Sequence, residues 1–228
     1  MPELALALIA FVGSHELLSH GLRKPLVAKL GEGGFAVLYS VVAALTLFWA
    51  VGAWQRAEPA QLWVAPLWLW SLGSIVMLVA SILFVGSMTS PNPALPGRGA
   101  AANAAPRGVL RITRHPMMWA FGLWAAVHAT LSGDKATVLF CFGLGFLALY
   151  GAAMQDRKKR GQLGAAWAAH EASTSYLPFG AQFGGRSSWS SINPGLVATL
   201  GGIVLWLAAT WAHPMMGAPV VGIWNMIG

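Results

Sequence analysis

Residues 66–88, PLWLWSLGSIVMLVASILFVGSM, form an apolar run without a single charged side chain. A helix of this length crosses the roughly 30 Å hydrocarbon core of a lipid bilayer. The whole chain has the same character, because 57% of its 228 residues are hydrophobic and only 9% are charged. Soluble domains carry about 25% charged residues. The composition therefore predicts an all-α, polytopic membrane protein, and we expect one domain over residues 1–228.

Similar apolar runs recur along the chain and predict a bundle of six transmembrane helices. Their approximate limits are residues 4–22, 34–54, 66–88, 116–132, 135–155 and 195–213. The fourth run is the shortest. Between the last two runs, residues 162–171 are expected to form a short helix on the membrane surface, with Trp167 at the level of the lipid headgroups.

The basic residues are distributed unevenly between the loops that join these runs. Nearly all of them lie in the first, third and fifth loops: Arg23, Lys24, Lys29, Arg98, Arg107, Arg111, Arg114, Arg157, Lys158, Lys159, Arg160 and Arg186. The other two loops contain only Arg56 and Lys135. Cytoplasmic loops are enriched in Lys and Arg, so the odd loops are predicted to be cytoplasmic and both termini to lie on the opposite side. The same distribution accounts for the net charge of +7, so no nucleic-acid partner is predicted.

Two of the six histidines, His15 and His128, lie deep inside predicted spans. An ionisable side chain at such a depth is costly and indicates a functional site, although a neutral imidazole bonded to a neighbouring helix is the alternative. At 1.5 Å per residue, His15 lies about 16 Å and His128 roughly 12 Å below the outer surface. His20 and His115 lie closer to the cytoplasmic interface.

The spacing of these histidines limits which of them can share a site. His115 and His128 are separated by about 20 Å along one helix, so they cannot hold the same iron. His15 and His20 point in different directions from the first span. A two-histidine site therefore takes one histidine from the first span and one from the fourth, and His15 with His128 is the pair that matches in depth.

Haem suits such a site, because helical bundles hold haem between facing helices through axial imidazoles. No Cys-x-x-Cys-His motif is present, so the expected cofactor is the non-covalent haem b. A zinc ion needs a third or fourth ligand, and the nearby acidic candidate is Glu16. The other interpretation of Glu16 is an ion pair with Arg23 or another basic residue of the loop. The single cysteine, Cys141, excludes a multi-cysteine metal site.

The basic residues just before the fourth span have two open interpretations each. Arg111 and Arg114 either pair with haem propionates or only contribute to the positive charge that keeps their loop on the cytoplasmic side. His115 either caps the helix that Pro116 opens or contacts lipid headgroups, or else it supports an axial ligand through a hydrogen bond or binds a haem propionate.

Four blocks of the chain resemble the NnrU family. They are FVGSHELLSHGLRKPLVAKLGEGGFAVLYSVVA (residues 11–43), RITRHPMMWAFGLWAAVHATLSGD (111–134), DRKKRGQLGAAWAAHEASTSYLPF (156–179) and WAHPMM (211–216). The family includes plant and cyanobacterial 15-cis-zeta-carotene isomerase, an integral membrane enzyme with haem b. The resemblance implies that His128 and His15 are the axial ligands, with His20 as the alternative to His15.

The resemblance also implies a reaction, the redox-gated cis–trans isomerisation of a lipophilic polyene. The basic, Ala- and Gly-rich composition with its positive-inside distribution predicts a protein of the bacterial inner membrane. The isomerase has a cysteine three residues before its fourth-helix ligand, and Ala125 occupies that position here. Ligand exchange through a cysteine is therefore not expected in this chain.

Two other functions fit the same sequence. Bacterial members of the family are linked to denitrification, which implies a non-enzymatic haem protein that supports the expression or maturation of nitrite and nitric oxide reductases. The Arg114-His115-Pro116 element also resembles isoprenylcysteine and phospholipid methyltransferases, which use S-adenosylmethionine. In the methyltransferase interpretation Arg114 and His115 bind S-adenosylmethionine and His128 is a core residue. In the haem interpretation His128 binds the cofactor, and Arg114 and His115 do not form its central site.

Overall fold

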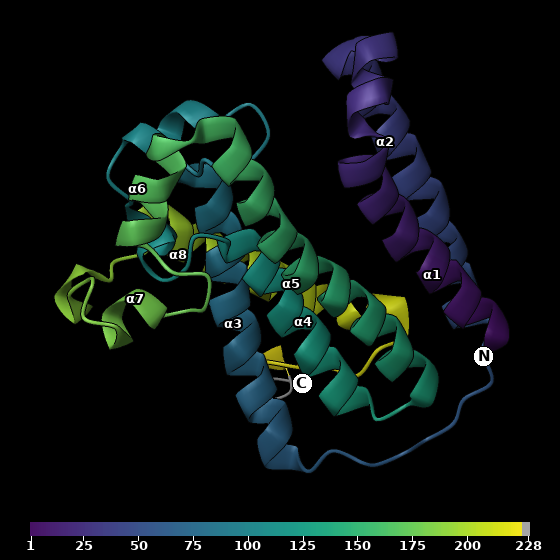
Figure 1. Ribbon diagram of the computed structural model, residues 1–228. Helices are drawn as coiled ribbons and strands as arrows, with labels where there is room; N and C mark the ends of the chain where they lie inside the picture. Colours follow the sequence, from purple (N-terminus) through teal and green to yellow (C-terminus); the bar gives the residue numbers. More distant parts are fainter. Residues whose placement is uncertain (225–228) are drawn as a thin grey trace. The chain divides into compact units, whose positions relative to one another are not determined.

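The computed structural model describes residues 1–224, and all of their regular elements are helices (Figure 1). The all-α prediction is therefore confirmed. The α-helices are α1 (Pro2–Glu16), α2 (Arg23–Gln55), α3 (Leu67–Thr89), α4 (Pro116–Ser132), α5 (Lys135–Leu163), α6 (Ala165–Ser173), α7 (Gly180–Phe183) and α8 (Leu196–Ala212). A π-helical turn, Leu17–Gly21, follows α1, and 3₁₀ turns cover Gly99–Asn103, Gly108–Arg111, Trp189–Ser191 and His213–Met216.

Five helical segments are long and apolar enough to cross a membrane: Pro2–Gly21, Arg23–Gln55, Leu67–Thr89, Lys135–Leu163 and Leu196–Met216. The chain is thus an integral membrane protein. The fourth predicted span forms α4 over the expected residues, but its 17 residues reach only about 25 Å at 1.5 Å per residue, less than the thickness of the hydrocarbon core. Five of the six expected spans therefore meet the length that a membrane requires.

Two helices extend beyond the apolar runs that predicted them. α2 begins at Arg23, so most of the expected first loop is helical, with a kink at Gly31 where φ is +69°. α5 continues to Leu163 and includes the charged residues after Gln155. Arg and Lys are good helix formers, so a helix continues readily from an apolar run into such a basic segment.

The short helix expected near residues 162–171 is α6, but its environment differs from the prediction. Gly164, with φ at +52°, separates α6 from α5. Trp167 is completely buried and packs against His170, with ring centroids 5.3 Å apart. Trp167 is therefore enclosed by protein rather than exposed on the surface, because α6 packs against the turn Gly99–Asn103; its level among the lipid headgroups stays a prediction.

The chain forms two compact units, each made of two segments. The first contains Met1–Ala65 and His128–Leu147, and the second contains Pro66–Val127 and Ala148–Gly228. α4 and α5 each contribute residues to both units.

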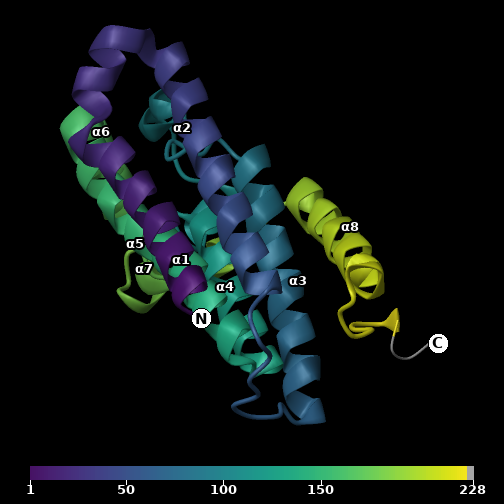
Figure 2. The ribbon, with the colours of Figure 1, turned by 90° about the vertical axis from the view of Figure 1, so that its right-hand side faces the viewer.

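In the first unit, α1 and α2 pack side by side as a helical hairpin (Figures 1 and 2). The C-terminal end of α2 is held to the start of α5, because Trp54 Nε1 donates to Thr137 Oγ1 at 3.1 Å. The segment after α2 is held in the same place, since the Ala60 amide donates to Asp134 Oδ1 at 2.8 Å. These bonds fix one end of the first unit.

In the second unit, α3 packs against α8 through small residues. A Cβ atom at Gly202 would lie 2.6 Å from the Cα of Ile82, so the two backbones approach closely there. Such contacts through small residues are how helices associate in lipid, where no hydrophobic force acts between them. A core cluster of Ala80, Leu83, Val109, Ile112 and Ala120 joins α3 to the segment before α4.

Candidate functional site

His15 in α1 is oriented by its own helix. Its Nδ1 lies 2.7 Å from the backbone oxygen of Phe11. A carbonyl oxygen can only accept, so Nδ1 carries the proton and Nε2 keeps its lone pair. The half-buried ring also packs edge-on against Phe11 and Tyr39, with centroids 4.5 and 5.3 Å away. Metal-binding histidines have this arrangement, in which one nitrogen bonds the protein and the other is left for the metal.

His20, the other histidine of the N-terminal segment, has a different environment. Its Nε2 lies 3.5 Å from Oε2 of Glu16, and its side chain is 30% exposed. The alternative partner expected for Glu16 was Arg23, but Arg23 pairs with Glu32 at 2.8 Å. His20 is thus a partner of a surface carboxylate, whereas His15 is held among aromatic rings.

His128 lies in α4, in the same compact unit as His15, and is half-buried. The positions of His15 and His128 along their helices can be compared through α5, which packs against α1. A Cβ atom at Gly143 of α5 would be only 2.9 Å from Cδ2 of Leu8 in α1. His15 lies about 10 Å further along α1 than Leu8, on the side away from the turn that joins α4 to α5. His128 lies about 8 Å from that turn, and Gly143 about 15 Å from it. The equal depth expected from the sequence is therefore not observed.

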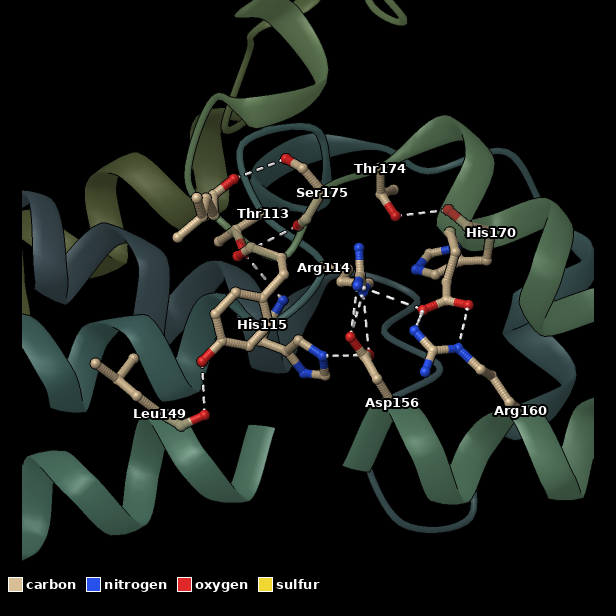
Figure 3. A network of polar contacts seen from close by, with 12 residues as sticks. Thr113, Arg114, His115, Leu149, Asp156, Arg160, His170, Thr174 and Ser175 are labelled. Carbon is tan, nitrogen blue, oxygen red and sulfur yellow. Dashed lines mark hydrogen bonds and ion pairs between the residues drawn. The ribbon is translucent and has the colours of Figure 1, made fainter. Parts of the chain in front are cut away.

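A second group of polar side chains surrounds the start of α4 (Figure 3). Asp156 of α5 is its centre. Arg114 Nε donates to Asp156 Oδ2 at 2.9 Å, and His115 Nε2 lies 2.6 Å from Oδ1. All three residues are buried, with 8%, 2% and 3% of Arg114, His115 and Asp156 exposed. This group is a buried, charge-assisted cluster that ties the start of α4 to α5.

The segment after α6 holds this cluster in place. The Arg114 amide donates to the Ser175 oxygen at 2.9 Å, and Thr113 Oγ1 donates to the Tyr176 oxygen at 2.7 Å. Tyr176 in turn donates its hydroxyl to the oxygen of Leu149 in α5 at 2.6 Å. Pro116 opens α4 at a position where a missing N–H costs nothing. The backbone around the Arg-His-Pro element is therefore bonded on both sides.

Glu171 of α6 is a second carboxylate beside Arg114. Its carboxylate accepts from Arg160 at 2.7 and 2.8 Å and lies 3.4 Å from Nη2 of Arg114. Arg114 is therefore neutralised by two carboxylates. Both Arg114 and His115 Nε2 bond to Asp156, whereas the buried Nδ1 of His115 has no hydrogen-bond partner among the described residues.

His170 lies beside this cluster and is 2% exposed. Neither of its ring nitrogens has a hydrogen-bond partner among the described residues. Burial, assisted by the positive charges of Arg114 and His115, lowers the pKa of His170 to about 4. The imidazole is therefore neutral at physiological pH, because a second cation there would have neither water nor a bonded partner.

We expect acid to destabilise the protein through His170. Its pKa is lower in the folded state than the ordinary value of about 6.5, so the unfolded chain binds a proton first as the pH falls. The resulting stability is fully present above pH 6.5 and is lost as the pH falls towards 4, by on the order of 3 kcal/mol. Thermal unfolding in detergent, recorded between pH 7.5 and 4, measures this loss. His170→Leu, which cannot titrate, should lose less stability over the same range, and equal losses in both proteins would contradict the assignment.

Sequence reasoning named Arg114 and His115 but did not name Asp156, Glu171 or Tyr176. The available signal for Asp156 was its position directly after an apolar run, as the only acidic residue within a basic segment. Arg111, expected beside Arg114, lies outside this cluster and donates from Nε to the Pro106 oxygen at 3.1 Å. Among residues 1–224, no three His, Cys, Asp or Glu side chains are grouped so as to hold a metal ion. This argues against the zinc site.

The fold and its apolar helices define an all-helical integral membrane protein. The model of one family, described as NnrU protein, matches residues 3–220, and the chain belongs to that family. It is 32% identical over 118 residues to the chloroplastic 15-cis-zeta-carotene isomerase of Zea mays. This match covers 49% of this chain and 31% of the isomerase. The chain is also 32% identical over 99 residues to the Nurim homolog of Drosophila melanogaster, over 40% of this chain and 39% of that one. The matched part thus spans about a third of each relative. No solved structure matches.

Proposed function

We propose that this chain is a membrane isomerase that binds haem b and converts a cis double bond of a lipophilic polyene into the trans form. The similarity to a carotene isomerase supports the reaction class. The observation that carries the cofactor proposal is the bond between His15 Nδ1 and the Phe11 oxygen, which leaves Nε2 as a metal ligand. His128 from α4 is the second proposed ligand, and a bacterial inner membrane is the proposed location.

The donors present fit haem b in kind, because two neutral imidazoles from two helices are its usual axial ligands. For one iron to be bound by both His15 and His128, the two residues must lie at the same level along their helices. In this structure His15 lies further than His128 from the turn between α4 and α5. His20 lies further from that turn than His15, so the register favours His15 of the two.

Haem b held by His15 and His128 would supply a redox-active iron close to the double bond of a polyene. The chain's own residues have simpler roles. The backbone oxygen of Phe11 fixes the orientation of His15, and Ala125 offers no thiol to replace His128. Apolar residues of α1 and α2, including Ile9, Leu45 and Phe48, are exposed, as expected for side chains that face lipid.

Absorption spectra of the detergent-purified protein, oxidised and dithionite-reduced, test this proposal. We expect a sharp reduced α-band in the wild type after haem-supplemented expression. His15→Ala and His128→Ala should abolish or broaden the band, whereas His20→Ala and the matched control His213→Ala should keep it. Isomerisation of 15-cis-zeta-carotene is then assayed in the same set. A colourless wild type, or bands that survive both ligand substitutions, would contradict the proposal.

The methyltransferase alternative requires Arg114 and His115 to be available to S-adenosylmethionine. Both are bonded to Asp156, which weighs against that role.

A further inference from the structure

A pocket of about 710 Å³ lies in the second unit, where α3 ends and α8 begins. Its wall includes Ser90 after α3, Arg107 and Arg111 from the segment before α4, and Ser191, Asn193 and Gly195 before α8. No acidic side chain lines it. The pocket therefore combines two positive charges with several neutral hydrogen-bonding groups.

Arg107 and Arg111 both have guanidinium N–H donors that form no hydrogen bond within the described residues. Arg107 is exposed, and none of the hydrogen bonds or ion pairs of the described chain uses its guanidinium. Arg111 is half-buried and donates only from Nε, to the Pro106 oxygen at 3.1 Å. Elsewhere in the unit the buried Arg114 is neutralised by Asp156 and Glu171. The pocket thus holds uncompensated positive charge.

Two backbone features shape this pocket for an anion. Leu196, Val197 and Ala198, the first residues of the 17-residue helix α8, line it, so their unpaired N–H groups and the positive end of the helix dipole lie at its wall. Gly108 has φ at +59°, and a Cβ atom there would lie 3.0 Å from Ser90 Oγ and 3.2 Å from the Pro194 oxygen. Glycine at this position keeps the wall open.

The surroundings of the pocket indicate where its ligand comes from. α3 and α8 belong to segments that are long and apolar enough to span a membrane, so the pocket lies at the membrane interface. Leu196, Leu200 and Val204 follow one another along one side of α8 and are 72%, 53% and 64% exposed. An acyl chain can therefore lie on α8 directly below the pocket.

We propose that this pocket binds the phosphate of an anionic phospholipid headgroup. Arg107 and Arg111 form charge-assisted hydrogen bonds with the phosphate oxygens, and the start of α8 donates from its backbone. The lipid's acyl chains lie along the apolar side of α8. The pocket belongs to the second compact unit, and the proposed haem ligands belong to the first.

The test is lipid retention by the delipidated, haem-free protein in detergent, measured by native mass spectrometry. The probes are dioleoylphosphatidylglycerol, dioleoylphosphatidylcholine and sodium phosphate. The variants are Arg107→Gln with Arg111→Gln, Gly108→Val, which narrows the pocket without removing charge, and Arg157→Gln. Arg157 is an exposed basic residue of α5 outside the pocket, so its variant is a control with matched chemistry.

We expect the wild type and Arg157→Gln to bind phosphatidylglycerol equally. The double arginine variant should bind it at least about tenfold more weakly, as expected for the loss of charge-assisted bonds worth about 1.4 kcal/mol or more. Gly108→Val should also bind it more weakly, because its side chain would occupy space beside Ser90 and Pro194 in the wall of the pocket. Equal binding by the double variant and the control would overturn the proposal. Equal affinity for phosphatidylcholine would overturn its anionic specificity, and displacement of the lipid by micromolar sodium phosphate would assign the pocket to a free phosphate instead.

Discussion

Replacing Asp156 by alanine is expected to lower the free energy of unfolding by about 3–5 kcal/mol, the usual cost of removing one partner from a buried ion pair. Asp156 is 3% exposed and bonds both Arg114 and His115. Without its carboxylate, Arg114 remains charged and is left with Glu171 at 3.4 Å. His115, whose other ring nitrogen has no partner among the described residues, loses its hydrogen bond.

Unfolding in detergent, followed by the fluorescence of the 12 tryptophans, measures this effect. Glu32→Ala provides the control, because it removes the carboxylate of the Arg23–Glu32 pair, in which the Glu32 side chain is 71% exposed. Exposed ion pairs contribute about 0–1 kcal/mol, so this variant should be nearly unchanged. Similar losses in both variants would show that the Asp156 cluster is no more important than a surface pair.

A further pair of variants separates a structural role of this cluster from a chemical one. Asp156→Asn keeps the size of the side chain, and its amide oxygen can still accept a bond from Arg114. We expect it to be destabilised less than Asp156→Ala. If the cluster only positions α4, Asp156→Asn should retain the reduced haem band of the wild type.

The apolar runs predicted most helices well, because helix length and hydrophobicity are local properties. α4 covers the predicted residues 116–132, since Pro116 favours the first helical position and Gly133, with φ at +61°, follows its end. α2 was less well predicted. The charges after Leu22 favour a loop in a pattern of apolar runs, yet Arg and Lys are compatible with a helix, and α2 begins at Arg23.

The polar cluster could not be predicted to the same degree, because its contacts join distant parts of the chain. Arg114 and Asp156 are 42 residues apart, and no periodicity identifies one as the partner of the other. The same limit applies to Trp167, since an amphipathic ring suits both a headgroup layer and a buried position. The sequence likewise does not reveal the close packing of Leu8 in α1 against Gly143 in α5.

The packing of α3 against α8 leads to the second large effect. Gly202→Leu is expected to destabilise the protein by roughly 3 kcal/mol or more, the upper range for overpacking a close contact. A Cβ atom at Gly202 would lie 2.6 Å from the Cα and 2.8 Å from the backbone nitrogen of Ile82. Backbone atoms cannot turn aside as the end of a side chain can, so the two helices must separate.

Gly151→Leu is the matched control for this prediction, because Gly151 is also a helical glycine in a membrane-spanning segment and a Cβ atom there meets nothing within 4 Å. It should be neutral or slightly stabilising, since leucine favours a helix over glycine by about 0.8 kcal/mol. Both variants are compared with the wild type by thermal unfolding in the same detergent. A smaller loss in Gly202→Leu than in Gly151→Leu would mean that α3 and α8 are not held at the close distance that Gly202 permits. The expected order instead identifies this glycine as the residue that allows the two helices to associate without a hydrophobic force between them.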